Sequence, residues 1–326
     1  MSRREFDEDD VRVRPGRQKS RPRSKQRPSH HDAEHGTVLA VDRGRFTVAT
    51  DGGATVFAVK ARELGRKGIV VGDHVDVVGD TSGEIDTQAR IVRRHERSTV
   101  LRRTADDDDP VERVIVANAT QLGIVTATAN PEPRTGLIDR ALVAAFDAGL
   151  QPILIITKPD LASPDELISH YAALDVPAVV VEKNHAHPEL DDVLRDQVTV
   201  LLGHSGVGKS TLVNTFTDAG RQTGRVNDVT GRGRHTSTSA VAIPLESGGW
   251  IIDTPGIRSF GLAHVDTSRV VGAFADLAEL IAACPRGCTH HEAECALNGT
   301  TDPALRARVE SLQRILAQPQ TESAPE

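Results

Sequence analysis

Cysteine, aromatic residues and long apolar stretches are all scarce in this chain of 326 residues. The three cysteines are an odd number within one short segment, which fits a metal site in a reducing compartment better than a disulfide framework. No stretch approaches the roughly 18 uninterrupted apolar residues that span a bilayer. The basic N-terminus also lacks the apolar stretch of a secretory signal. We therefore expect a cytoplasmic protein that does not enter a membrane.

Acidic residues are missing from one segment, although the whole chain carries a formal net charge of −7. Between Arg12 and Arg27 every charged residue is basic, and two prolines interrupt local structure. Residues 1–34 are therefore predicted to form a disordered basic arm that neutralises phosphates, with a solubilising tail that has no partner as the alternative. At the other end, residues 319–326 are predicted to be a disordered tail.

Short apolar alternations separated by glycines fill residues 35–104. Five such strands with turn residues between them predict a small antiparallel β-barrel of the oligonucleotide-binding (OB) type. Phe46 and Phe57 are the only Phe, Tyr or Trp residues of this segment, so stacking of nucleic-acid bases would be limited. We expect this barrel to contact the backbone of RNA, and a purely structural barrel is the alternative.

The length exceeds that of one ordinary domain of about 100 to 200 residues, and a second pattern begins after an acidic run. Asp106–Asp109, followed by Pro110, is typical of a linker. In residues 110–262 apolar strands alternate with helical stretches, which predicts parallel strands with helical crossovers in a doubly wound α/β domain. Residues 263–318 have a helical pattern on both sides of the cysteine cluster.

A phosphate-binding loop is indicated where an apolar strand meets a helix. The sequence Gly203-His-Ser-Gly-Val-Gly-Lys-Ser210 has Walker A spacing, follows VTVLL and precedes STLVNTF. Its glycines let backbone N–H groups converge on phosphate oxygens, Lys209 reaches the β- and γ-phosphates, and Ser210 is a ligand for Mg²⁺. The alternative is a glycine-rich turn without a nucleotide. The residues assigned to the nucleotide here are Gly203, His204, Ser205, Gly206, Val207, Gly208, Lys209, Ser210 and Thr211.

Two further motifs favour guanine over adenine. Asp253-Thr-Pro-Gly256 ends an apolar strand, where Asp253 can hold a Mg²⁺-bound water and Gly256 can sense the γ-phosphate. In Thr157-Lys-Pro-Asp160 the carboxylate of Asp160 accepts both guanine N1–H and the exocyclic amine, and Lys158 packs along the base. Taken alone, the second motif is equally consistent with a turn that caps the next helix.

The order of these motifs is unusual, because Asp160 precedes Gly203 whereas the phosphate loop comes first in ordinary GTPases. The domain is therefore predicted to be circularly permuted, a change that preserves the site when the chain termini of the domain lie close together. Position 157 carries Thr where the usual motif has Asn, and VVVEKNHAHPEL lacks the usual Ser-Ala that contacts the guanine carbonyl. Backbone around Val181–Lys183 is the expected replacement.

The segment from His35 to Leu316 resembles the RsgA family of circularly permuted GTPases that depend on the small ribosomal subunit. The motifs that carry the resemblance are IDR at 138–140, TKPDL, GHSGVGKSTLVN, GRGRHTSTS at 231–239, DTPGIRSFGL at 253–262 and CPRGCTHHEAECAL. The resemblance implies an OB barrel, a permuted GTPase domain and a C-terminal zinc domain. It also implies that a monomer binds the small subunit and its rRNA, hydrolyses GTP with Mg²⁺ under stimulation by the subunit, and takes part in the late maturation of that subunit, with hydrolysis promoting release.

A glutamine is missing from the position that orients the attacking water in many GTPases, where this chain has Ile257. His235 is the nearest candidate replacement, since a switch loop that binds Mg²⁺ and the γ-phosphate can bring its imidazole to the water. The resemblance supports that catalytic role, and an exposed loop histidine is the alternative. Thr236 or Thr238 is expected to contact Mg²⁺ and the γ-phosphate, whereas His204 is expected to be peripheral.

The cysteine cluster contains the ligand set of a zinc site. Cys284, Cys288, His290 and Cys295 supply three thiolates and one imidazole, which suits tetrahedral Zn²⁺ without an open position. One structural zinc ion per chain is the prediction. His291 is an alternative ligand, and three free cysteines in a helical turn are the alternative to a metal site.

Two other functions remain compatible with the sequence. One is a zinc-bearing RNA-binding or scaffold protein whose nucleotide site is a conformational switch with little turnover. The missing glutamine is compatible with this alternative. The other is an ATP-dependent kinase, which Asp160 argues against.

Overall fold

The computed structural model describes residues 30–65, 68–84, 87–104, 112–183, 185–222, 240–254 and 265–317. The predictions for the basic arm before residue 30, for Asp106–Asp109 and for the tail 319–326 lie outside these ranges. The chain divides into two compact units, Met1–His31 and Asp32–Glu326, and the fold described below is that of the second unit. Within the described ranges, no helix is long and apolar enough to cross a membrane.

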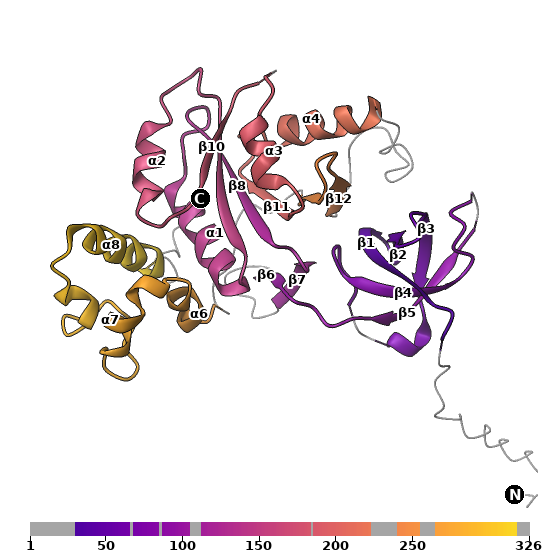
Figure 1. The fold of residues 1–326 in the computed structure, drawn as a ribbon, viewed down its shortest axis with the longest axis horizontal. Helices are drawn as coiled ribbons and strands as arrows, with labels where there is room; N and C mark the ends of the chain where they lie inside the picture. The colour runs from indigo at the N-terminus through magenta and orange to yellow at the C-terminus, as the bar shows by residue number, and fades with distance from the viewer. Residues whose placement is uncertain are drawn as a thin grey trace, which may run out of the picture. The chain divides into compact units, whose positions relative to one another are not determined.

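The predicted five-stranded barrel is confirmed. The strands follow the order β1-β2-β3-β5-β4, and pairing of β4 back to β1 closes the barrel; β3 and β5 run parallel and all other neighbours antiparallel (Figure 1). Alternate residues point inward, as in β2, so that small and branched apolar side chains fill the interior. The strands are β1 (Glu34–Asp42), β2 (Arg45–Thr50), β3 (Thr55–Lys60), β4 (His74–Gly79) and β5 (Ala89–Arg94).

A fully buried carboxylate holds one end of the barrel together. Asp73 is 0% exposed and accepts two hydrogen bonds from the guanidinium of Arg97, from Nε to Oδ1 at 2.6 Å and from Nη2 to Oδ2 at 2.8 Å. The backbone N–H of Val70 donates to the same Oδ2 at 2.8 Å. The two-point geometry compensates for the desolvation of both charges, which a single contact would not do.

The last segment of the expected barrel differs from its predicted form. The residues from Ala89 to Arg103 form two strands, because β6 (Val100–Thr104) leaves the barrel and pairs antiparallel with β7 (Glu112–Ala117). Asn118 stabilises this departure: its side chain accepts from the N–H of Ser98 at 2.8 Å and donates to the carbonyl of Gly72 at 2.8 Å. An alternation of apolar and polar residues does not reveal this change of pairing partner. The composition of β6, partly apolar and partly polar, suits either sheet.

The predicted doubly wound α/β domain is also confirmed. Its strands follow the order β10-β9-β8-β11-β13-β12, and all run parallel except β12. Every residue of the central strand β8 is buried, as expected for a strand covered on both faces. The elements are β8 (Gln121–Ala127), α1 (Thr135–Ala148), β9 (Gln151–Thr157), α2 (Asp165–Ala172), β10 (Ala178–Val181), α3 (Pro188–Leu194), β11 (Val198–Gly203), α4 (Lys209–Gln222), β12 (Val241–Pro244) and β13 (Trp250–Asp253).

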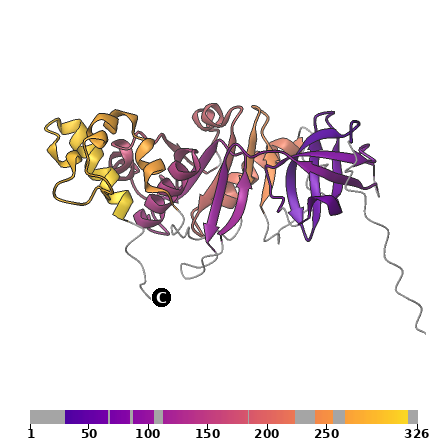
Figure 2. The same ribbon diagram turned by 90° about the horizontal axis from the view of Figure 1, so that it is seen from below.

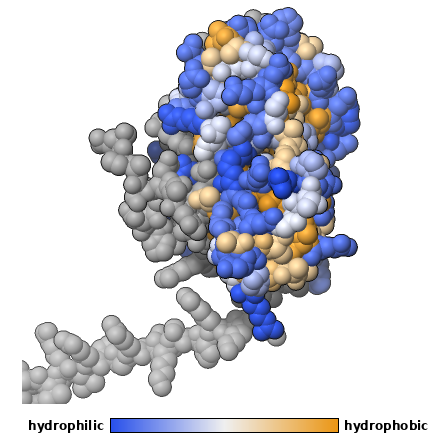
Figure 3. All heavy atoms as spheres, turned by 90° about the vertical axis from the view of Figure 1, so that its left-hand side faces the viewer, coloured by the Kyte–Doolittle hydropathy of each residue, from blue (hydrophilic) through white to orange (hydrophobic). Residues whose placement is uncertain are grey.

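The C-terminal part is helical, as predicted, but its first helical stretch is divided. Instead of one helix there are α6 (Thr267–Gly272), a 3-10 turn and α7 (Ala278–Ala282), followed after the cysteine cluster by α8 (Pro303–Ala317). Figures 1 and 2 show these helices as one group. Their large apolar side chains, such as Phe274 and Leu312, are buried. Accordingly, hydrophilic residues predominate on the side shown in Figure 3 and apolar ones are scattered among them.

Two arginines of α8 bind acidic groups of the α/β domain. Arg308 contacts Asp175, which follows α2, at 2.6 Å, and it contacts Asp276 at 2.5 Å. Arg314 lies 3.6 Å from the carboxylate of Asp139 on α1, which is buried. Both guanidinium groups also lie over aromatic rings, at 5.0 and 5.3 Å from the ring centres, which adds cation–π attraction.

We predict that Arg97→Met destabilises the barrel because it leaves the Asp73 carboxylate buried without its partner. Loss of one partner from a buried pair costs about 3 to 5 kcal/mol, so amides of β1 and β4 should exchange with solvent at least about 100-fold faster. Arg195→Met is the control, since its pair with Asp192 is solvent-exposed and should change stability by less than about 1 kcal/mol. Equal exchange rates in both variants would contradict the structural role of Asp73.

Candidate functional site

The nucleotide motifs meet at one edge of the parallel sheet. Strands β9, β8, β11 and β13 are successive parallel neighbours, so their carboxyl ends lie at the same edge. These ends carry Thr157, Ala127, Gly203 and Asp253, and the register places Ala127 beside Thr157 and Leu201 beside Asp253. Ligands of open α/β sheets bind at this edge. The sheet therefore assembles one site from motifs that are far apart in the sequence.

The phosphate loop has the backbone that its glycines predict. It connects the end of β11 at Gly203 to the start of α4 at Lys209. A Cβ on Gly203 would lie 2.7 Å from the carbonyl oxygen of Val125, and Gly208 has φ of +94°, which L side chains rarely adopt. The loop thus leads into the N-terminus of α4, a helix of 14 residues. Backbone N–H groups and the helix dipole favour a phosphate there.

The lysine of the loop and the aspartate of the second motif form an ion pair. Lys209 Nζ donates to Asp253 Oδ1, and both side chains are largely buried. Thr254 is buried and donates from its hydroxyl to the carbonyl of Leu201 at 2.8 Å, which ties the end of β13 to β11. A hydroxyl from Ser210 and a carboxylate from Asp253 are oxygen ligands of the kind that Mg²⁺ prefers, so the residues present suit this ion.

Thr157 connects the guanine motif to the phosphate loop. Its side chain is buried, and its hydroxyl lies 2.5 Å from the carbonyl oxygen of Val207 and 3.2 Å from that of Thr126. The departure from Asn at this position therefore keeps a direct contact with the loop.

The loop that carries Asp160 is held by residues that the sequence did not single out. Lys158 has a left-handed backbone with φ of +58°, and its carbonyl accepts from the hydroxyl of Thr128 at 2.5 Å. Its ammonium group donates to the carbonyl of Asn130. Thr128 and Asn130 directly follow β8, and that position at the carboxyl edge is the signal that could have identified them. Asp160 itself is exposed, as a residue that reads a base must be.

The expected replacement for the guanine-carbonyl motif also lies at this edge. Val181, the last residue of β10, pairs with Thr157. The backbone from Val181 to Lys183 therefore begins beside the end of β9, where the Thr157–Asp160 motif starts. Its contact with the guanine carbonyl stays a prediction.

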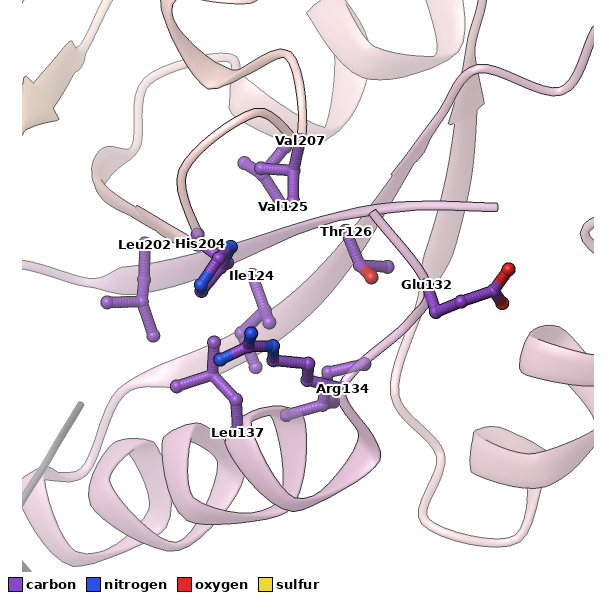
Figure 4. Close-up of a pocket in the computed structure, with 11 residues that line it drawn as sticks. Ile124, Val125, Thr126, Glu132, Arg134, Leu137, Leu202, His204 and Val207 are labelled. Atoms are coloured by element: carbon purple, nitrogen blue, oxygen red, sulfur yellow. The ribbon is translucent and has the colours of Figure 1, made fainter. Parts of the chain in front are cut away.

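His204 lines a pocket beside the phosphate loop. Figure 4 shows its ring near Arg134, between the loop and the start of α1, whereas Glu132 points away. His204 Nδ1 lies 2.9 Å from the carbonyl oxygen of Ser205. The predicted residues His235, Thr236, Thr238 and Gly256 lie outside the described ranges, so their roles stay predictions.

The predicted zinc ligands converge in the C-terminal part. The Sγ atom of Cys284 lies 3.7 Å from that of Cys295, and His290 Nδ1 lies 3.6 to 3.8 Å from the three sulfurs. Ligands about 2.3 Å (sulfur) and 2.0 Å (nitrogen) from a tetrahedral Zn²⁺ would be separated by about the same distances. The four donor atoms therefore fit this ion.

The geometry also distinguishes His290 from its neighbour. His290 is buried, with a left-handed backbone of φ +70° that turns its ring toward the sulfurs, while His291 is exposed and outside the cluster. Burial lowers the pKa of His290, which keeps the imidazole neutral and able to bind a cation. Outside the ligands, Glu292 accepts from the backbone N–H of Thr289 at 2.9 Å, and Gln313 of α8 donates to the carbonyl of His290 at 2.8 Å.

Fold and site together define a circularly permuted P-loop domain that lies between an OB barrel and a cysteine-rich helical part. A family model described as RsgA GTPase matches residues 94–263. The chain belongs to the RsgA GTPase family.

Two relatives agree with this assignment. The chain is 37% identical over 240 residues to the small ribosomal subunit biogenesis GTPase RsgA of Pseudomonas syringae pv. syringae (strain B728a). This match covers 70% of the chain and 69% of the relative. It is 38% identical over 218 residues to the protein of the same name from Pseudomonas fluorescens (strain SBW25), where the match covers 64% of this chain and 63% of the relative.

Two crystal structures are similar in fold. YjeQ from Thermotoga maritima has a TM-score of 0.66 at 24% identity, over 89% of this chain and 99% of that one. YloQ, described as a circularly permuted GTPase, has a TM-score of 0.61 at 21% identity, over 89% and 97%.

We predict that Thr157→Val weakens binding of GTP and of GDP alike, each by about tenfold. Valine has nearly the same shape but leaves the buried carbonyl of Val207 without its donor, which costs about 1 to 3 kcal/mol. Fluorescent analogues of both nucleotides give the two affinities. Thr215→Val is the matched control, since its hydroxyl lies on the exposed side of α4 and contacts Thr211. A loss confined to GTP would place Thr157 at the γ-phosphate instead.

Proposed function

We propose that this chain hydrolyses GTP with Mg²⁺ and acts in the late maturation of the small ribosomal subunit. In this proposal the subunit stimulates hydrolysis, and hydrolysis promotes release. The observation that carries it is the joining of the phosphate loop to Asp253 through Lys209 and to the guanine loop through Thr157, at one sheet edge. A glycine-rich turn without a nucleotide, or a turn that only caps a helix, would not need either contact.

Each group at the edge has a distinct role in binding. Asp160 pairs with guanine, while backbone N–H groups at the start of α4 and the ammonium of Lys209 bind the phosphates. Ser210 and Asp253 hold Mg²⁺, directly or through water, and Gly256 senses the γ-phosphate. When bound, Mg²⁺ supplies positive charge to the phosphate oxygens as the β–γ bond breaks. Because Lys209 and Asp253 already pair, the site orients these opposite charges before a nucleotide arrives.

The hydrolytic step needs a group that orients water, and Ile257 has no polar atom for it. We propose His235 for this role, with Thr236 or Thr238 at Mg²⁺ and the γ-phosphate. Contact with the subunit would bring the segment 231–239 to the nucleotide, so that turnover is slow without the subunit. Positioning and charge stabilisation account for most catalysis of phosphoryl transfer, and both depend on such a segment.

The partner is proposed to be the small ribosomal subunit with its rRNA, bound by a monomer in the cytoplasm without membrane contact. The names of the Pseudomonas relatives, small ribosomal subunit biogenesis GTPases, support the partner. The barrel adds exposed arginines on β5, namely Arg90 and Arg93, which suit phosphate groups. The basic residues between Arg12 and Arg27 would extend that contact.

Two assays separate this function from its alternatives. Multiple-turnover hydrolysis measured with and without small subunits distinguishes the GTPase from a scaffold with a slow nucleotide switch. Competition between GTP and ATP distinguishes it from a kinase, since adenine cannot donate two hydrogen bonds to Asp160. No stimulation by subunits would contradict the proposal.

We predict that His235→Ala lowers subunit-stimulated turnover at least about 100-fold and leaves nucleotide affinity nearly intact. A positioned orienting or acid–base group contributes about 10² to 10⁴ in rate, whereas the ground-state contacts come from Lys209, Ser210 and backbone. Single-turnover hydrolysis on saturating subunits measures the effect, and His204→Ala is the control that should lose much less. Parental hydrolysis in His235→Ala with slow hydrolysis in His204→Ala would reverse the two roles.

We also predict one zinc ion per chain, bound by Cys284, Cys288, His290 and Cys295. Because metal binding and folding of such a site are coupled, Cys288→Ser should lose the zinc and unfold the C-terminal part before nucleotide binding is affected. Elemental analysis and amide exchange of α8 measure the two effects. His291→Ala, the exposed neighbour, should retain the metal, and a chain purified without chelator that contains no zinc would contradict the assignment.

A further inference from the structure

A second group of donor atoms converges on the barrel, far in sequence from the cysteine cluster. His35 on β1 lies directly opposite Asp76 on β4 in the strand register, and His95 follows β5. His35 Nδ1 is 2.8 Å and His95 Nε2 is 2.7 Å from the same carboxylate oxygen, Oδ1 of Asp76. The three donor atoms lie within 4.8 Å of one another.

Cross-strand hydrogen bonds alone would account for some of this arrangement, because such pairs stabilise β-sheets. Two features go beyond that explanation. Both imidazoles direct a nitrogen at one oxygen and leave the other, Oδ2, to Arg93 at 2.9 Å. The two rings also stand edge to face, with centroids 4.4 Å apart, so that their nitrogens approach one point from different directions.

The exposure of the three groups suits a site that takes an ion from solvent. The Asp76 side chain is 9% exposed, whereas those of His35 and His95 are 45% and 34% exposed. The carboxylate is therefore held by the barrel, while the imidazoles reach the surface and can shift. Each imidazole nitrogen would move about half an ångström farther from the carboxylate oxygen, since nitrogen and oxygen ligands about 2.0 to 2.2 Å from a tetrahedral ion are separated by about 3.3 Å.

The charges around the group favour a cation overall. Although burial opposes it, hydrogen bonds from His95 and His35 hold the pKa of Asp76 below its usual range, so the carboxylate is negative. His74 stacks beside His35 at 6.3 Å, and burial lowers its pKa, so it adds no positive charge at neutral pH. Among the residues that the structure describes, Arg93 is the arginine paired with Asp76, and its exposed side chain binds Oδ2 rather than the oxygen that the imidazoles share.

We propose that His35, Asp76 and His95 form a second metal site, which binds a divalent transition ion such as Co²⁺ or Ni²⁺ in addition to the one zinc ion of the cysteine cluster. Two imidazoles and one carboxylate suit these ions, whereas Mg²⁺ and Ca²⁺ prefer oxygen ligands alone. The ion takes the place of the protons that face Asp76, and each neutral imidazole then carries its one proton on its other ring nitrogen, His35 on Nε2 and His95 on Nδ1. It links β1, β4 and the end of β5, and it keeps at least one position open to solvent.

The test uses the full chain with its cysteine site already filled by zinc, followed by titration with Co²⁺ at neutral pH. We expect one further equivalent to bind with visible d–d absorption and without the near-ultraviolet charge-transfer band that a thiolate ligand gives. His95→Gln is the decisive variant, because glutamine retains an N–H donor for Asp76 but is a poor ligand for the ion. Its affinity for Co²⁺ should fall at least tenfold, and Asp76→Asn should do the same.

His31→Ala is the control, since this exposed histidine is near His35 in sequence but does not contribute to the group. It should bind Co²⁺ as the parent does. Absence of a second equivalent, or equal binding by the parent and His95→Gln, would overturn the proposal and leave a purely hydrogen-bonded group. Amide exchange of β1 and β4 in the metal-free variants verifies that the barrel remains folded in each comparison.

Discussion

The hydrogen bond from Thr157 to the carbonyl of Val207 joins two loops that are 50 residues apart in the chain. In a permuted domain the guanine loop is made first and the phosphate loop later, so no short covalent connection relates them. Their relation depends on strand pairing, since β8 lies between β9 and β11, and on this one buried hydroxyl. Lys209 extends the same connection to Asp253 on the next strand. Thr157, Lys209 and Asp253 are thus brought together by the sheet rather than by sequence order.

The parts that sequence predicted well are those whose physical signal is local. The phosphate loop is recognised from glycines that follow an apolar strand directly. The metal cluster is recognised from the spacing of Cys284, Cys288 and Cys295. Both signals span only a few residues. The five strands of the barrel were predictable for the same reason, since alternation follows directly from a sheet with one buried face.

The parts that it missed depend on partners distant in the sequence. The departure of β6 from the barrel is stabilised by Asn118, whose side chain accepts from the N–H of Ser98. The contacts of Thr128 and Asn130 with Lys158 can be inferred only when β8 is known to lie beside β9. The division between α6 and α7 likewise follows from packing of Phe274 and Leu277 inward, which a helical pattern across the segment does not indicate.

Helix α8 contacts two different parts of the protein at once. Gln313 holds the backbone of the cysteine cluster, while Arg308 and Arg314 hold acidic groups beside α2 and on α1. An insertion or deletion of one residue within α8, between Arg308 and Gln313, would turn the rest of the helix by about 100° and shift it by about 1.5 Å. Gln313 and Arg314 would then miss their partners while Arg308 kept its own, although every one of them was still present. The spacing of these residues within α8 is therefore as necessary as their identity.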